Sequence, residues 1–206
     1  MLTSIDWHAF WTGIDWVEAA GAVLGAICVG LQVKQIIWNW PVGILNNILY
    51  IVVFFRSGLF ADCGLQVVYI IISIYGWWAW LRAGEQHTHL KISRVTFRHA
   101  LVIAVATAGS VMGIHWLLKA YTPSNVPWGD ATTVSLSLAA QYMISRKILE
   151  NWYVWNAANV LCIALFIYKH LYPTASLYAI FFGMCVLGFI DWRKELTADE
   201  QAAAAV

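Results

Sequence analysis

The sequence has little charge of either sign. Only 11% of its 206 residues are charged, with 12 Lys and Arg against 11 Asp and Glu, whereas a soluble domain carries about 25%. The net charge of +1 provides no basic surface for a nucleic acid. We therefore expect no nucleic-acid partner.

Motifs of catalytic and metal sites are also missing. The chain contains no Walker A loop and no HExxH or GxSxG motif. Its four cysteines lack CxxC spacing, and we interpret them as small buried hydrophobic residues. We therefore expect no catalytic residue, no metal site and no cofactor.

Apolar residues are in excess instead. They make up 61% of the chain and include 13 Trp, a residue that favours the membrane interface. A transmembrane helix needs about 20 mostly apolar residues. Seven segments approach that length: Val17–Ile37, Pro41–Phe55, Cys63–Leu81, Ala100–Leu118, Ala131–Ser145, Trp152–Tyr168 and Ser176–Ile190. The sequence thus predicts an all-α polytopic membrane protein with seven transmembrane helices.

The remaining stretches predict the organisation around these spans. Residues 1–15 mix aromatic and polar residues, as in a segment that lies on the membrane surface. We expect a cytoplasmic linker at 83–99, a linking helix at 100–121 and a C-terminal tail at 195–206. With the N-terminus outside and the C-terminus cytoplasmic, nine of the 12 Lys and Arg lie inside, as the positive-inside rule requires.

An internal repeat relates residues 16–82 to residues 131–194. Chance explains the Leu and Ile matches between the two, but it explains matched Asn, Gly and Trp less well. At an offset of 112 the matches include Asn39 with Asn151, Trp40 with Trp152, Asn47 with Asn159, Gly76 with Gly188, and Trp80 with Trp192. Two three-helix repeats on either side of one linking helix point the same way through the membrane. In transporters built from repeats, the solute binds between them near mid-depth.

Uncharged amides and aromatic rings inside the spans are the candidate site residues. Hydrogen bonds between helices, worth about 0.6–2 kcal/mol each, are the alternative role for the amides, and interfacial anchoring is the alternative for the Trp residues. A cavity of amides and rings suits a flat heteroaromatic solute and tolerates a delocalised cation. The predicted substrate-binding residues are Trp40, Asn46, Asn47, Gln66, Tyr69, Gln141, Trp152, Trp155, Asn156, Asn159 and Tyr178.

The spans hold no mid-membrane carboxylate. Proton- and sodium-coupled carriers usually keep an acidic or imidazole group at that depth. Every Lys, Arg, Asp and Glu of this chain lies at a predicted helix end or in a loop. We therefore predict facilitated diffusion without ion coupling.

Three stretches resemble the PnuC family of vitamin transporters. They are the Trp-Val-Glu-Ala-Ala-Gly segment at 16–21, the Ile-Tyr-Gly-Trp-Trp-Ala-Trp segment at 74–80, and residues 145–159, where a basic pair precedes Glu-Asn-Trp-x-x-Trp-x-x-x-Asn. The last stretch is the most specific, and the resemblance covers residues 16–195. By position, Trp152, Trp155 and Asn159 carry the family's motif.

The resemblance implies a three-one-three helix fold like that of the SWEET sugar transporters, and a homotrimer. It also implies facilitated uptake of nicotinamide riboside across the bacterial inner membrane, for NAD biosynthesis, with trapping by intracellular phosphorylation. Asn46 or Asn47 would be the first-repeat counterpart of Asn159, and Gln141 an extra contact. Gly43 stands where the second repeat has Trp155, so the implied site is asymmetric.

Other interpretations remain at this point. Related subfamilies carry thiamine or riboflavin, and nicotinamide riboside and thiamine are both flat cations that amides and indoles do not distinguish. A ligand-binding membrane sensor without flux is an alternative of a different class. A membrane enzyme would need a buried acid, base or metal set, for which the sequence has no candidate.

Overall fold

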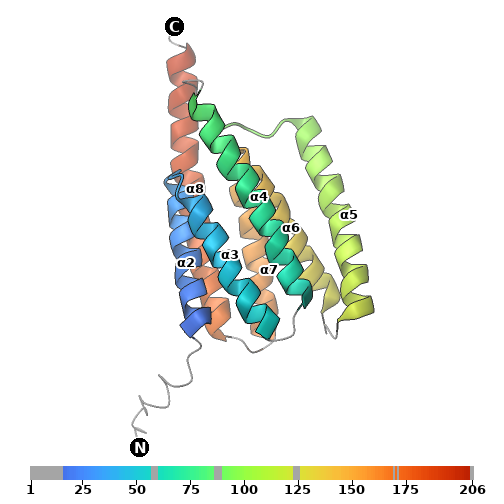
Figure 1. The fold of residues 1–206 in the computed structure, drawn as a ribbon. Helices are drawn as coiled ribbons and strands as arrows, with labels where there is room; N and C mark the ends of the chain where they lie inside the picture. The colour runs from blue at the N-terminus through green and yellow to red at the C-terminus, as the bar shows by residue number, and fades with distance from the viewer. Residues whose placement is uncertain are drawn as a thin grey trace, which may run out of the picture.

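The computed structural model describes residues 16–56, 60–85, 90–122, 126–168, 170 and 172–204. Within these residues the chain folds into seven α-helices and no β-strand, which confirms the all-α class (Figure 1). The helices are α2 (Trp16–Val33), α3 (Asn39–Arg56), α4 (Phe60–Glu85), α5 (Phe97–Tyr121), α6 (Pro127–Ser145), α7 (Asn151–Tyr168) and α8 (Tyr172–Ala204). The predicted surface segment 1–15 lies outside the described residues.

The helices are apolar, and each of the seven predicted segments falls on one of them. Three stretches among the described residues are long and apolar enough to cross a bilayer: Cys63–Arg82, Phe97–Tyr121 and Thr174–Ala204. Large apolar side chains cover the outside, such as Val105 at 64% exposure and Phe97 at 84%. Water would not tolerate so much exposed apolar surface on a monomer, so the chain is a membrane protein.

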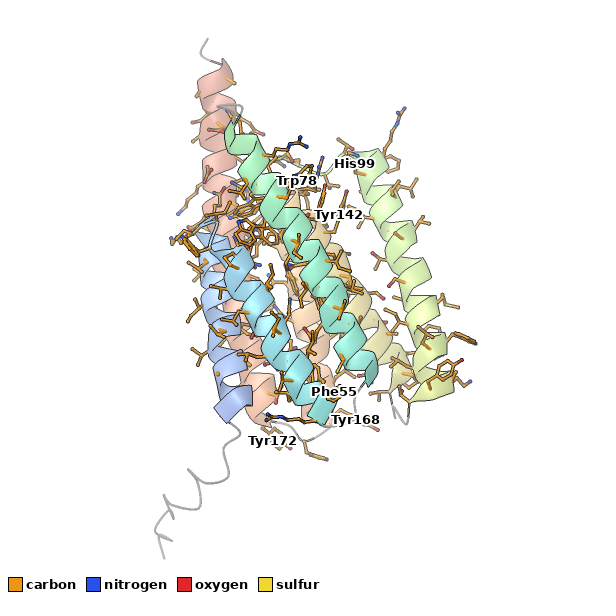
Figure 2. The ribbon with its side chains drawn as sticks, viewed as in Figure 1. Phe55, Trp78, His99, Tyr142, Tyr168 and Tyr172 are labelled. Carbon is orange, nitrogen blue, oxygen red and sulfur yellow. The ribbon has the colours of Figure 1, made fainter. Side chains whose placement is uncertain are left out.

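Aromatic residues gather near both ends of the helices (Figure 2). Phe55, Tyr168 and Tyr172 lie at one end, while Trp78 and Tyr142 lie toward the other. All five are more than a third exposed, as expected for rings in the two interfacial belts of a membrane protein.

Six helices close into a ring. Helix α3 lies between α2 and α4, and α7 lies between α6 and α8; the ring closes where α4 packs on α6 and α8 packs on α2. Helix α5 packs on α6 outside the ring and contains no buried residue. In Figure 1 the even-numbered helices run upward and α3, α5 and α7 run downward.

Two turns at the upper end of the ring have the same backbone geometry. Gln35 has φ 54° and Lys147 has φ 50°. Asn39 Nδ2 donates to the Ile36 carbonyl at 2.7 Å, and Asn151 Nδ2 donates to that of Ile148 at 2.6 Å. These asparagines begin α3 and α7. We call this end of the ring, which carries residues 34–38 and 146–150, the turn end.

The linker before α5 packs against the second of these turns, residues 146–150. Ser93 N donates to the Lys147 carbonyl at 3.0 Å, and the Ser93 carbonyl accepts from Leu149 N at 2.9 Å. Ile92 is buried at 6% exposure. This part of the predicted linker is therefore packed against the ring. Helix α5 then begins at Phe97 and is capped by Thr96, whose Oγ1 accepts from His99 N.

Candidate functional site

Two tryptophans predicted to bind substrate fill the core at the turn end. Trp40 and Trp152 are both 0% exposed. A Cβ added at Gly76 would lie 2.2 Å from the Trp40 ring, and one added at Gly188 would lie 2.6 Å from the Trp152 ring. Each tryptophan therefore packs directly on a glycine, and its Nε1 is buried without a hydrogen-bond partner among the described residues. Their role in binding stays a prediction.

The same packing occurs twice. Trp40 meets Trp80 edge to face with ring centroids 5.4 Å apart, and Trp152 meets Trp192 in the same way at 5.4 Å. The interval in sequence between the two tryptophans of a pair is the same in both copies. These edge-to-face pairs, the glycines beneath them and the two turns all recur in the register of the internal repeat.

Two buried amides bind small polar side chains deeper in the ring. Gln141 Nε2 on α6 donates to Ser73 Oγ on α4 at 3.4 Å. Asn159 Nδ2 on α7 lies 3.6 Å from Cys185 Sγ on α8. Ser73 and Cys185 also occupy matched positions of the internal repeat. We call these four residues the amide layer.

Tyrosines from several helices converge next to the amide layer. Tyr69 on α4 lies near Ser137 on α6. Tyr178 on α8 lies near Cys162 on α7, Tyr69 and Tyr50 on α3. Helices α3, α4 and α8 thus contribute the rings, and α6 and α7 contribute small polar neighbours. We call Tyr50, Tyr69 and Tyr178 the tyrosine cluster.

Asn46 belongs to the same region. A Cβ at Gly25 would lie 3.7 Å from Asn46 Nδ2 and 3.7 Å from the Phe181 ring, and the Phe181 ring centroid is 5.8 Å from that of Tyr178. Asn46 Oδ1 is buried without a hydrogen-bond partner among the described residues. A buried orphan acceptor costs about 1–3 kcal/mol, so this atom is available to a solute or a water molecule.

The structure thus brings together part of the predicted set. Asn46, Tyr69, Gln141, Asn159 and Tyr178 come from α3, α4, α6, α7 and α8. Asn47 and Gln66 are half-buried on α3 and α4. Trp155 and Asn156 are also half-buried, and each has one buried polar atom without a partner among the described residues.

Sequence reasoning missed the small partners of these groups. Cys185 and Cys162 are free and buried, as expected for small hydrophobic residues, but each also contacts a polar group of the site. Ser137 carried no signal of its own. The repeat register that matches Ser73 with Cys185 was the one available sign that both positions hold amide partners.

Polar contacts tie the two parts of the ring together at the turn end. Lys147 Nζ donates to Gln35 Oε1 at 2.7 Å and lies 4.6 Å from the centre of the Trp80 ring. Lys34 pairs with Asp191 at 3.0 Å. Burial lowers the pKa of Lys147, and the charge of Glu195 raises it in partial opposition. The inner face of the ring is therefore bridged at this end.

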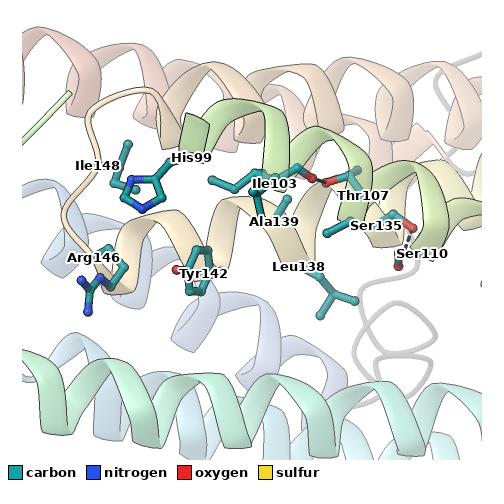
Figure 3. A pocket seen from close by; sticks show the side chains of 12 residues that line it. His99, Ile103, Thr107, Ser110, Ser135, Leu138, Ala139, Tyr142, Arg146 and Ile148 are labelled. Atoms are coloured by element: carbon teal, nitrogen blue, oxygen red, sulfur yellow. Dashed lines mark hydrogen bonds between the residues drawn. The ribbon is translucent and has the colours of Figure 1, made fainter. Parts of the chain in front are cut away.

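A hollow lies outside the ring. A cavity of about 400 Å³ runs between α5 and α6 and is lined by none of the eleven predicted residues (Figure 3). A second hollow, on the outer face of α8, also excludes them. The α5–α6 cavity is therefore separate from the predicted site residues.

An all-helical membrane protein whose ring of helices encloses uncharged polar side chains has the form of a small-solute transporter. The family model described as "Nicotinamide mononucleotide transporter" matches residues 15–194. The chain belongs to this family, as the resemblance to PnuC proteins predicted.

Individual relatives agree with this assignment. The chain is similar to the nicotinamide riboside transporter PnuC of Escherichia coli, at 29% identity over 87% of this chain and 85% of that protein. It is also similar to the riboflavin/roseoflavin transporter RibM of Streptomyces davaonensis, at 28% identity over 87% and 85%. Among solved structures it resembles the vitamin B3 transporter PnuC, with a TM-score of 0.73 and 26% identity over 92% of this chain and 86% of that one.

Proposed function

We propose that this protein carries nicotinamide riboside across the bacterial inner membrane by facilitated diffusion. The observation that supports this most directly is the uncharged interior of the ring, where the amide layer lies next to the tyrosine cluster. Tyr69 and Tyr178 would face the pyridinium ring of the substrate, whose delocalised charge is attracted to aromatic faces. Asn46, Gln141 and Asn159 would exchange hydrogen bonds with its carboxamide and ribose hydroxyls.

Charge favours the riboside over the mononucleotide that the family description names. The mononucleotide differs by a phosphate group, and transfer of that anion into a low-dielectric interior requires paired cations. Every buried polar side chain among the described residues is uncharged. Lys147, the basic residue that reaches inward at the turn end, is already engaged by Gln35.

Thiamine and riboflavin remain the alternative substrates within this family. Thiamine is also a flat cation, and the likeness to RibM supports riboflavin to a similar extent. The presence of nicotinamide riboside transporters among the relatives favours the riboside. A sensor that binds one of these compounds without moving it is the alternative of a different class.

The proposed architecture has two parallel three-helix repeats, residues 16–82 and 131–194, with the linking helix 100–121 between them. The resulting three-one-three arrangement of seven spans is the one implied by the likeness to SWEET transporters. Support comes from the matched turns, glycines and tryptophan pairs, and from the common direction of α2 and α6 in Figure 1. We further propose a homotrimer with the N-terminus outside and the C-terminus cytoplasmic.

Gating would take place at the turn end, which this topology puts on the cytoplasmic side. The Lys147–Gln35 and Lys34–Asp191 contacts each join one repeat to the other. They must break for a solute to leave into the cytoplasm. No carboxylate belongs to the amide layer or the tyrosine cluster, so the cycle would need no coupled ion. Phosphorylation inside the cell would retain the product for NAD biosynthesis, and the protein itself would not act as an enzyme.

The test is uptake into liposomes containing the purified protein. Labelled nicotinamide riboside should equilibrate down its own gradient, with the same rate when proton and sodium gradients are removed. The mononucleotide should not enter. Faster flux of thiamine or riboflavin would favour the alternative substrates, and binding of the riboside without flux would favour the sensor. A strict requirement for an ion gradient would contradict facilitated diffusion.

A further inference from the structure

The groove between α5 and α6 has two chemically different ends (Figure 3). His99, Tyr142 and Arg146 surround its mouth, which lies at the turn end. Ile148 lies beside His99 at this mouth, and the wall below is apolar and is formed by Val102, Ile103, Ala106, Leu138 and Ala139. The groove therefore changes from a polar, basic mouth to an apolar body.

The hydroxyl groups at the far end of the groove are already paired. Ser135 Oγ donates to Ser110 Oγ at 3.0 Å, and Thr107 Oγ1 donates to the Ile103 carbonyl at 2.7 Å. These groups need no partner from a ligand, so the far end accepts an apolar chain without leaving unpaired donors.

The depth of the groove corresponds to one membrane leaflet. Ser110 follows His99 by eleven positions along α5, and Arg146, the C-cap of α6, follows Ser135 by eleven positions. At a rise of about 1.5 Å per residue the groove is about 16 Å long. Half of the hydrocarbon core of a bilayer is about 15 Å thick. A groove of this length begins at the interface and ends near the bilayer centre.

The mouth has positive charge without a bound carboxylate. Arg146 Nη1 donates to Tyr75 Oη at 3.0 Å, which orients the guanidinium group. The three ion pairs found among the described residues do not involve Arg146, and no acidic residue lines the groove. A planar guanidinium group at the cytoplasmic interface suits a phosphate, which it binds through two parallel hydrogen bonds.

We infer that the α5–α6 groove binds one anionic phospholipid of the cytoplasmic leaflet. The phosphate lies at Arg146 and His99, and one acyl chain follows the apolar wall down to Ser110 and Ser135. Helix α5 packs on a single helix of the chain, so this lipid supplies much of its remaining contact. The site is independent of the substrate that the ring carries.

Native mass spectrometry of the delipidated protein tests this inference. Phosphatidylglycerol and phosphatidylcholine with the same acyl chains are added separately. We expect tighter binding of phosphatidylglycerol, and a loss of that preference by about tenfold or more in Arg146→Gln, because two charge-assisted hydrogen bonds are removed. Arg82→Gln is the matched control, since Arg82 lies at the same end on α4, over the Trp78 ring and outside the groove.

A second variant tests the groove without changing its charge. Ala139→Phe puts a ring into the apolar wall and should weaken the binding of both lipids while Arg146 is intact. Arg146→Gln and Ala139→Phe must both elute from size exclusion at the volume of the parent protein. If Arg146→Gln does not, Arg146→Lys replaces it and should show an intermediate lipid preference.

Three results would overturn the inference. The first is equal affinity of the parent protein for the two lipids. The second is an equal loss of lipid preference in Arg82→Gln and Arg146→Gln. The third is that two copies of Val102→Cys cross-link and that added phosphatidylglycerol does not reduce the cross-linking. The last result would mean that a second copy of the chain covers the groove. None of these measurements depends on transport, so a failure of the proposed function would leave them interpretable.

Discussion

The contact between Trp152 and Gly188 allows the packing of α7 on α8 to be tested by the single substitution Gly188→Ala, which adds one methyl group. A Cβ at Gly188 would approach the Trp152 ring to 2.6 Å, whereas a Cβ at Gly183, on the same helix, meets nothing within 4 Å. Both glycines lie within α8, so Gly→Ala gives the same helix-propensity gain at each position, up to about 1 kcal/mol. Only the packing term differs.

Gly188→Ala should therefore destabilise the protein, and Gly183→Ala should stabilise it slightly. Trp152 is fully buried and rigid, so the ring has no free space into which to move, and overpacking of this kind costs about 1–3 kcal/mol. After the propensity gain is subtracted, the two variants should differ in the free energy of unfolding by the full packing term. The assay is unfolding in detergent with increasing denaturant, followed by circular dichroism and compared at matched protein concentration.

The first repeat supplies a replicate of this experiment. A Cβ at Gly76 would lie 2.2 Å from the Trp40 ring, and one at Gly64 on the same helix meets nothing within 4 Å. Gly76→Ala should be destabilising and Gly64→Ala should not. Equal stabilities for Gly188→Ala and Gly183→Ala would refute the packing of α7 on α8 described above. Both substitutions are in α8, and only the one at Gly188 faces the Trp152 ring.

The other predictions concern transport and the turn end. Asn159→Leu should abolish or strongly reduce nicotinamide riboside flux while leaving the elution volume unchanged; undiminished flux would remove Asn159 from the site. Lys147→Met should increase the rate at which a thiol reagent labels the native Cys185, which is only 4% exposed, because it removes the 2.7 Å bond to Gln35; an unchanged rate would exclude this contact as a gate. The pKa of Lys147 is lowered in the native state from its ordinary value of 10.5. Between the lowered pKa and the ordinary one, the native state has lost this proton while the unfolded state still binds it. The free energy of unfolding should rise with pH through that window, and Lys147→Met should flatten the rise.

Several features of the fold could be predicted from the chain alone because they depend on local composition. The seven apolar segments coincide with seven helices among the described residues, since in a bilayer each backbone polar group must be paired within its own segment. Asn39 and Asn151, matched in the repeat, both begin a helix after the same turn. Family membership also followed from a local stretch, residues 145–159.

The composition of the site was predictable, but the role of each residue was not. Indole rings suit a membrane interface, a binding cavity and a helix contact equally well, and the sequence alone did not show that Trp40 and Trp152 pack on Gly76 and Gly188. Amides are ambiguous in the same way. The partners Ser73 and Cys185 distinguish Gln141 and Asn159 from amides that face away from the ring.

The sequence by itself determined that this chain is helical, belongs in a membrane and has two matched parts, because the hydropathy of each segment is a local property. The tertiary structure alone decided that α2 meets α8 and α4 meets α6, that α5 stands outside the ring, and that a groove lies between α5 and α6. The reason is that lipid tails are as apolar as a helix interface. In a soluble protein the buried face of a helix is marked by its apolar residues, whereas here apolar side chains occur on the outer faces as well. The neighbours are selected by shape and by a few polar contacts, such as Gln141 to Ser73.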